Sequence, residues 1–153
     1  MARDFQCVIG NETKEQMKAL AWRLPDTLVA CVGNGSSVIG MFHPFIKNKS
    51  VRLVGAESAC NGVDTSRHSW LKLTGRAEYH AVADAQAPEG FCSLAELEGS
   101  IPSLEASHAV YQAMQVASAM TSNELLVICI SDNCGKDLNT ITEVLPAIGP
   151  QIG

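Results

Sequence analysis

Three short runs of residues constrain this chain most, because nearly every position in each run is apolar. They are Thr27–Gly33, Val51–Glu57 and Glu124–Ser131. A strand with one wet face alternates apolar and polar residues, whereas a parallel strand covered on both faces is apolar throughout. Stretches with helical spacing separate the three runs. We therefore expect an α/β fold, a parallel sheet with flanking helices. Its strands should lie near Thr27–Val32, Val51–Ala56 and Leu125–Ile130.

The first half of the chain predicts three further elements. Phe5–Gly10 is a short apolar run, which predicts a strand. A helix should follow it, with Asn11 or Thr13 as its cap, and should end before Pro25. Ser37–Ile46 predicts a short helix.

The second half predicts a loop from Ser58 to Arg76 and a strand end within Ala77–Asp84. Asp84 is predicted to cap a helix that runs to Glu98, with Pro88 in its first turn, where a missing N–H costs little. Pro102 should open a second helix, and a last helix is expected near Asp137–Leu145. The apolar face of the Pro102 helix is predicted to consist of Ala106, Ala109, Val110, Ala113, Ala117 and Met120.

Composition bounds the class of protein. The chain has 153 residues, which suits one domain, and 46% of them are hydrophobic against 18% charged. A net charge of −5 argues against a nucleic-acid or anionic-membrane surface. No apolar run reaches the ~20 residues that span a bilayer, and the start does not resemble a secretory signal, so a cytoplasmic protein is expected. The six cysteines are scattered, which predicts reduced thiols, no metal site and no recognisable Cys–His pair.

A glycine- and serine-rich turn follows the first apolar run and is the main candidate site. It consists of Gly33, Asn34, Gly35, Ser36 and Ser37. Backbone N–H groups in such a turn, together with the next helix terminus, favour an anion. The turn matches neither a Walker loop nor the dinucleotide fingerprint, so a phosphate site and a plain turn remain equally open on pattern alone. A second polar loop, Ser131–Asp137, should reach the same sheet edge, since both loops leave carboxyl ends of parallel strands.

Several separate segments resemble the β chain of tryptophan synthase, and most of all the β portion of the fused fungal enzyme. They read "RLPDTLVACVGNGSSVIGMFHPF", "EGSIPSLEASHA", "LLVICISDNCGKD" and "LPAIGPQIG". The resemblance implies that residues 1–153 form a single tryptophan synthase β-like domain fragment with part of the type II fold of pyridoxal-phosphate enzymes. That family joins indole to L-serine by β-replacement to make L-tryptophan.

The resemblance also implies roles for individual residues. Gly33, Asn34, Gly35, Ser36 and Ser37 stand where the family cradles the phosphate of pyridoxal phosphate. Glu98 is expected near the cofactor ring, and Ser131 is expected to face the pyridine nitrogen.

The chain departs from the family pattern where the chemistry is done. The N-terminal half, with the Schiff-base lysine and the catalytic carboxylate, has no counterpart, and a substrate-holding segment is missing after Ser69. "GGGSN" has become "GNGSS", and "SGRGDKD" has become "SDNCGKD". Covalent catalysis on the cofactor requires the lysine amine. The isolated chain is therefore predicted to be catalytically incompetent, with no catalytic residues and with cofactor binding weak or lost.

Three functions stay open at this stage. The chain could be an enzyme part that works only with a tryptophan synthase-type subunit or with the missing half. It could be a pseudoenzyme or binding module that keeps a weak phosphate site or a protein interface. It could also be a fragment without activity. Beside these, His108 is expected to be a hydrogen-bonded core or surface histidine, and Glu57 to support a strand end.

Overall fold

Four parallel strands form one sheet in the computed structural model, which describes residues 2–33, 35–59 and 69–130. The strands are β1 (Thr27–Val32), β2 (Arg52–Ser58), β3 (Glu78–Val82) and β4 (Leu126–Cys129), in the order β3-β2-β1-β4. In register, Thr27 of β1 lies opposite Arg52 on one side and Leu126 on the other. The three predicted parallel strands are confirmed within two residues at most ends, and so is the strand within Ala77–Asp84.

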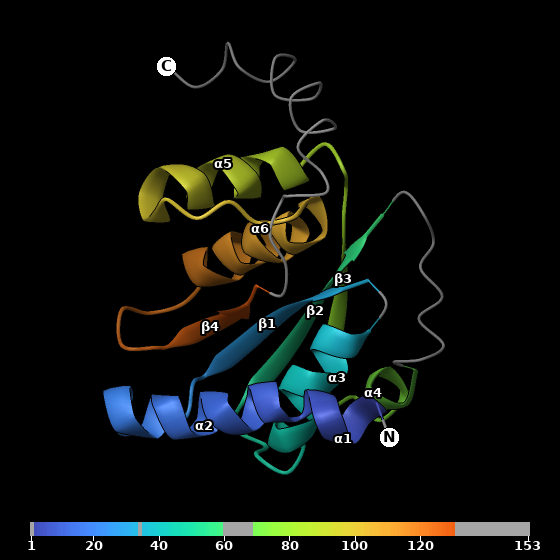
Figure 1. Ribbon diagram of the computed structural model, residues 1–153, viewed down its shortest axis with the longest axis vertical. Coiled ribbons are helices and arrows are strands. Elements are labelled where there is room, and N and C mark those ends of the chain that lie inside the picture. Colours follow the sequence, from blue (N-terminus) through green and yellow to red (C-terminus); the bar gives the residue numbers. More distant parts are fainter. Residues whose placement is uncertain (1, 34, 60–68, 131–153) are drawn as a thin grey trace.

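Helices cover both faces of the sheet (Figure 1). One face carries α3 (Ser36–Phe42), the 3₁₀ helix η1 (His43–Phe45) and α4 (Ser69–Leu73). The other face carries α6 (Leu104–Ser118), and α5 (Ala87–Glu98) forms an outer layer on α6. Every residue of β1 is buried, which explains its unbroken apolar run. No helix among the described residues has the length and apolar character to cross a membrane.

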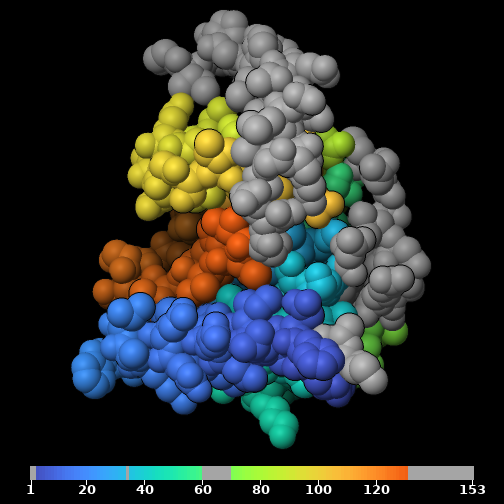
Figure 2. All heavy atoms as spheres, viewed as in Figure 1, coloured from blue at the N-terminus to red at the C-terminus, as the bar shows by residue number. Residues whose placement is uncertain are grey.

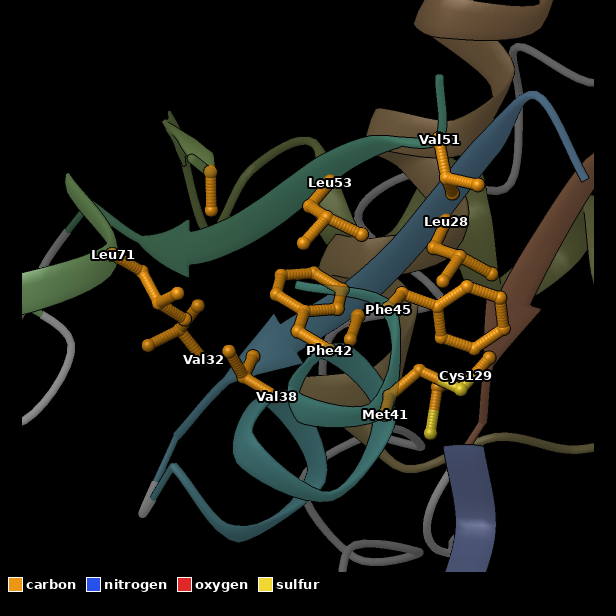
Figure 3. Close-up of a cluster of buried hydrophobic side chains, with 12 residues drawn as sticks. Leu28, Val32, Val38, Met41, Phe42, Phe45, Val51, Leu53, Leu71 and Cys129 are labelled. Atoms are coloured by element: carbon orange, nitrogen blue, oxygen red, sulfur yellow. The ribbon is translucent and has the colours of Figure 1, made fainter. Parts of the chain in front are cut away.

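The larger core cluster lies between strands β1 and β2 on one side and the helices α3 and η1 on the other (Figure 3). Phe42 and Phe45 project from α3 and η1 toward the strands and are fully buried. Leu28, Leu53 and Val38 pack in the same cluster. Leu71 from α4 closes one end of it, so the short helix after β2 belongs to the core.

Small side chains form the opposite core. Ala109 and Ala113 of α6 are buried against Val29 and Val54 of the sheet, so α6 lies close to the strands. Most residues of the apolar face predicted for this helix are buried. Ala117, however, is exposed, and Val116 is buried in its place.

The predicted strand at Phe5–Gly10 is wrong, because this segment is helical. α1 (Ala2–Gln6) and α2 (Val8–Ala21) follow each other with a break at Cys7. The helix thus begins before Asn11 and Thr13, neither of which is its cap. A Cβ on Gly10 would lie 2.6 Å from the carbonyl oxygen of Met41, so glycine permits close packing of α2 on α3. Short apolar runs do not distinguish strand from helix, and here tertiary packing decided.

Asp84 is not the cap of the helix that ends at Glu98. Gln86 occupies that position, and Asp84 instead binds side chains of neighbouring elements. Pro88 lies in the first turn and Gly99 ends the helix at φ +65°, both as predicted. The predicted loop from Ser58 to Arg76 contains α4 within its described part. The helix predicted near Asp137–Leu145 lies outside the described residues.

Asp26 ties the start of β4 to the start of β1. Its carboxylate accepts hydrogen bonds from the Leu125 N–H at 2.7 Å and from the Arg23 guanidinium at 2.7 Å. Its own N–H donates to the Leu125 carbonyl at 2.8 Å. The bond from the Leu125 N–H is the main reason why the pKa of Asp26 lies below its usual value.

Candidate functional site

The candidate site lies at the carboxyl edge of the sheet between β1 and β4. These strands are parallel neighbours, so Gly33 after β1 and Ile130 after β4 lie at the same edge of the sheet. The chain passes from β1 to α3 on one face, whereas it enters β4 from α6 on the other face. The strand order therefore reverses between β1 and β4, and in open α/β sheets ligands bind outside the carboxyl ends of the strands at such a switch point. The sequence predicted that its two polar loops, Gly33–Ser37 and Ser131–Asp137, would lie at this edge.

The turn after β1 has a backbone that suits an anion. Gly35 adopts the left-handed conformation, φ +83°, and no side chain caps the helix N-terminus that follows it. The first N–H groups of α3 therefore lack an intrahelical partner. Ser36 is exposed and Ser37 is half-buried, while Gly33 leads into the turn from β1. Asn34 lies outside the described residues.

Glu105 is the residue at this turn that the sequence reading missed. A Cβ built on Gly33 would lie 2.9 Å from its Oε2 atom, so the carboxylate lies directly against the turn. Glu105 is in the first turn of α6, which Ser103 caps by accepting from the Ala106 N–H at 3.2 Å. A signal was available, since Glu105 stands in the quoted "EGSIPSLEASHA" segment. Its negative charge opposes an anion in the turn.

The other predicted cofactor contacts are placed differently. Glu98 is the exposed last residue of α5, in the outer helical layer. The structure therefore does not bring Glu98 against Gly33, as it does Glu105. Ser131 lies outside the described residues, two positions beyond the end of β4. Contacts of Glu98 and Ser131 with a cofactor remain predictions.

Glu57 lies at the end of β2, opposite Val32 in the register of the sheet. Its Oε1 atom is buried and has no hydrogen-bond partner among the described residues. Burial raises the pKa of this carboxyl group, and the charge of Lys72 partly counters that rise. Lys72 of α4 is thus a cation whose charge acts on the carboxyl group of Glu57.

A hydrogen-bond network joins the ends of β2 and β3 to α6. Ser58 Oγ donates to Asp84 Oδ1 at 2.6 Å, and His108 Nε2 lies 3.1 Å from the same oxygen. His108 Nδ1 lies 2.8 Å from the Leu104 carbonyl oxygen. His108 is therefore a buried, hydrogen-bonded histidine, as expected from the sequence. The serine binds the carboxylate rather than the imidazole, so this network does not activate a nucleophile; it holds the first turn of α6.

This geometry defines the class of the protein: an α/β protein with a parallel sheet and a glycine-serine turn at the carboxyl edge of its strands. No family model matches the chain.

A curated relative gives the particular protein to which the chain is similar. The chain is 40% identical over 200 residues to a protein of Saccharomyces cerevisiae described as tryptophan synthase. The match covers the whole chain but only 28% of that relative. The chain is thus homologous to a part of tryptophan synthase. The matched length exceeds that of the chain, so the relative has residues within this region that the chain lacks.

Proposed function

We propose that the chain is a tryptophan synthase β-like fragment whose residues 1–153 form a single domain unit. In this proposal it belongs to a pyridoxal-phosphate enzyme that joins indole to L-serine, and it does not catalyse that reaction as an isolated chain. One observation carries the proposal: a glycine-serine turn at the carboxyl edge of the sheet, in a chain 40% identical over 200 residues to a tryptophan synthase. The required partner is a tryptophan synthase-type subunit or the missing half.

The turn fits the phosphate end of pyridoxal phosphate. Gly35 provides the left-handed position, and the N–H groups of Ser36 and Ser37 are available to oxygen acceptors. Charge-assisted hydrogen bonds contribute ~1.5–3 kcal/mol each before ordering costs. The carboxylate of Glu105 lowers this gain. We expect a dissociation constant near ~1 mM, which is about −4 kcal/mol.

The aldehyde end of the cofactor finds no matching lysine among the described residues. Lys14 donates to the Pro44 carbonyl and to Asn48 Oδ1. Lys47 and Lys49 precede β2, which places them toward the opposite edge of the sheet. Lys72 lies on α4, and its charge acts on the carboxyl group of Glu57. The turn therefore suits the phosphate, whereas no described lysine stands in the family's attachment motif.

The first prediction from this proposal is an absence of turnover. The purified chain with pyridoxal phosphate, indole and L-serine should form no tryptophan, and borohydride should not fix the cofactor stoichiometrically on one lysine. The physical reason is that covalent catalysis needs a positioned amine. Full-length tryptophan synthase of S. cerevisiae, assayed in parallel, is the positive control. Stoichiometric trapping on a single residue, with Lys72 the one to inspect first, would overturn the proposed incompetence.

A second prediction concerns the turn itself. Titration with inorganic phosphate should shift backbone amide resonances at Gly33, Gly35, Ser36 and Ser37, with half-saturation near ~1 mM. Ser36→Asp should abolish these shifts, because it adds a negative charge beside the anion. Glu105→Gln should tighten binding several-fold, because it removes the opposing charge seen at Gly33. Resonances that stay unmoved at high phosphate would mean that the turn binds no anion.

The alternative is a pseudoenzyme or binding module, and one observation favours it specifically. The turn keeps its left-handed Gly35, while Lys14 is held by the Pro44 carbonyl and by Asn48. Such a chain would bind phosphate in the titration yet remain inactive when the lysine-bearing segment is supplied. Recovery of tryptophan synthesis on adding that segment would favour the enzyme instead.

A further inference from the structure

A cavity of about 890 Å³ lies beside α3, on the side where α1 and α2 cross it. Figure 2 shows α1 and α2 as a continuous band over this part of the molecule. The walls of the cavity come from α1 and α2, from α3 with η1, and from α4. Among the described residues predicted to hold the cofactor, which are Gly33, Gly35, Ser36, Ser37 and Glu98, none lines it. Pockets that hold small organic molecules measure roughly 300–1,000 Å³, so its size is appropriate for such a ligand.

One part of the lining is apolar. Ile39, Ile46 and Leu71 contribute aliphatic side chains, and Trp70 contributes an indole. The Trp70 residue is 59% exposed, although α4 is otherwise anchored by the buried Leu71 beside it. An aromatic ring exposed at the wall of a cavity offers a surface on which a flat apolar group can stack.

The polar part of the lining contains a Cys–His contact that the sequence did not predict. Cys7 Sγ lies 3.4 Å from His43 Nδ1, across a separation of 36 residues. Burial raises the pKa of the Cys7 thiol, and the charge of Asp4 raises it further. The thiol therefore keeps its proton. In the tautomer in which the thiol donates to Nδ1, His43 carries its own hydrogen on Nε2. That N–H remains as a donor for an acceptor group.

The charges of the lining favour an anion. Arg3 binds the Asp4 carboxylate through both Nε, at 3.0 Å, and NH2, at 2.8 Å, so these two charges compensate each other. Lys47 is the remaining cation among the described lining residues. A flat apolar wall, an N–H donor and one uncompensated ammonium thus surround the same space.

We propose that this cavity binds a small amphipathic carboxylate with a flat apolar body. The body packs on Trp70, Ile39 and Ile46, and the carboxylate accepts hydrogen bonds from Lys47 and His43. The proposal is independent of the phosphate turn and of tryptophan synthesis, because it uses none of their residues.

Tryptophan fluorescence tests occupancy, with 3-phenylpropionate as the probe. The chain has two tryptophans, and Trp22, at the end of α2, is 90% exposed and does not line the cavity. In the Trp22→Phe variant, which reports Trp70 alone, the probe should cause a saturable change in emission. In Trp70→Phe, which reports Trp22 alone, it should cause none. Circular dichroism establishes that both variants are folded.

Charge selection is tested by paired lysines. Lys47→Gln should weaken binding of 3-phenylpropionate roughly tenfold, because it removes a charge-assisted hydrogen bond. Lys49→Gln, an exposed change outside the lining, should leave binding unchanged. The neutral 3-phenylpropanamide should bind the parent chain about as weakly as the acid binds Lys47→Gln.

Thiol labelling gives an independent readout. Saturating 3-phenylpropionate should slow maleimide modification of Cys7, measured by peptide mass spectrometry, and should not slow that of Cys92 on α5. The proposal is overturned by a lack of saturable change from Trp70, or by an equal change from Trp22. Equal binding of acid and amide, or an unaltered affinity in Lys47→Gln, overturns it as well.

Discussion

Replacing Phe42 with alanine is expected to lower the free energy of unfolding by about 3–5 kcal/mol. The Phe42 ring is fully buried at the end of α3 and packs in the cluster between α3 and the sheet (Figure 3). Removing the ring loses the free energy gained by transferring it from water into the core. It also leaves a cavity that the close-packed neighbours fill only in part. Single domains have only ~5–15 kcal/mol in total, so the variant should be near its unfolding threshold at room temperature.

Urea unfolding followed by circular dichroism measures this effect. The midpoint should fall strongly while the dependence on urea stays the same, because the surface exposed on unfolding hardly changes. Leu20→Ala serves as the matched control, since Leu20 is 82% exposed on α2 and its loss should cost less than ~0.5 kcal/mol. A loss at Phe42 no larger than at Leu20 would mean that α3 does not pack on the sheet as described.

Gly90→Val is the second large effect, expected to destabilise by ~1–3 kcal/mol or more. A Cβ at Gly90 would lie 2.4 Å from the Ser107 carbonyl oxygen and 2.7 Å from the Tyr111 nitrogen. Both contacts are with the backbone of α6, so relief requires α5 to move away from α6. The expected fall in melting temperature is roughly 2–12 °C for a chain of this size.

Gly99→Ala separates close contact from backbone strain. Gly99 has φ +65° and open space around its Cβ position, so alanine there should cost only ~1 kcal/mol. If Gly90→Val melts no lower than Gly99→Ala, then α5 and α6 are not in close contact. Both substitutions test the same helix, because Gly90 lies within α5 and Gly99 directly follows its last residue.

The strands were predictable because a strand that is buried on both faces consists almost entirely of apolar residues. Leu28, Val29 and Ala30 are each fully buried, and no polar residue interrupts them. Helix ends at glycine and proline were predictable for a similar reason, since Gly99 and Pro88 act locally on the backbone. The location of the candidate turn followed from the strand it leaves.

The errors have a common cause, which is contact between residues far apart in the chain. Phe5–Gly10 is helical because Gly10 and Gly40 allow α1 and α2 to approach α3, and no local pattern records that approach. Glu105 lies at Gly33 only because α6 is placed against β1. Asp84 binds His108 rather than capping its own helix. Pairings of this kind depend on the assembled sheet.

The place of β1 in the sheet has a consequence for synthesis of the chain. One neighbour of β1 is β4, and the hydrogen bond from the Leu125 N–H to Asp26 closes a separation of 99 residues. At ~5–20 residues per second, a ribosome needs on the order of 5–20 s to make that length. During this interval the edge of β1 that later pairs with β4 has no partner strand. A nascent chain therefore presents the aggregation-prone "TLVACV" edge, and a chaperone that shields it until β4 emerges should raise the yield of folded protein.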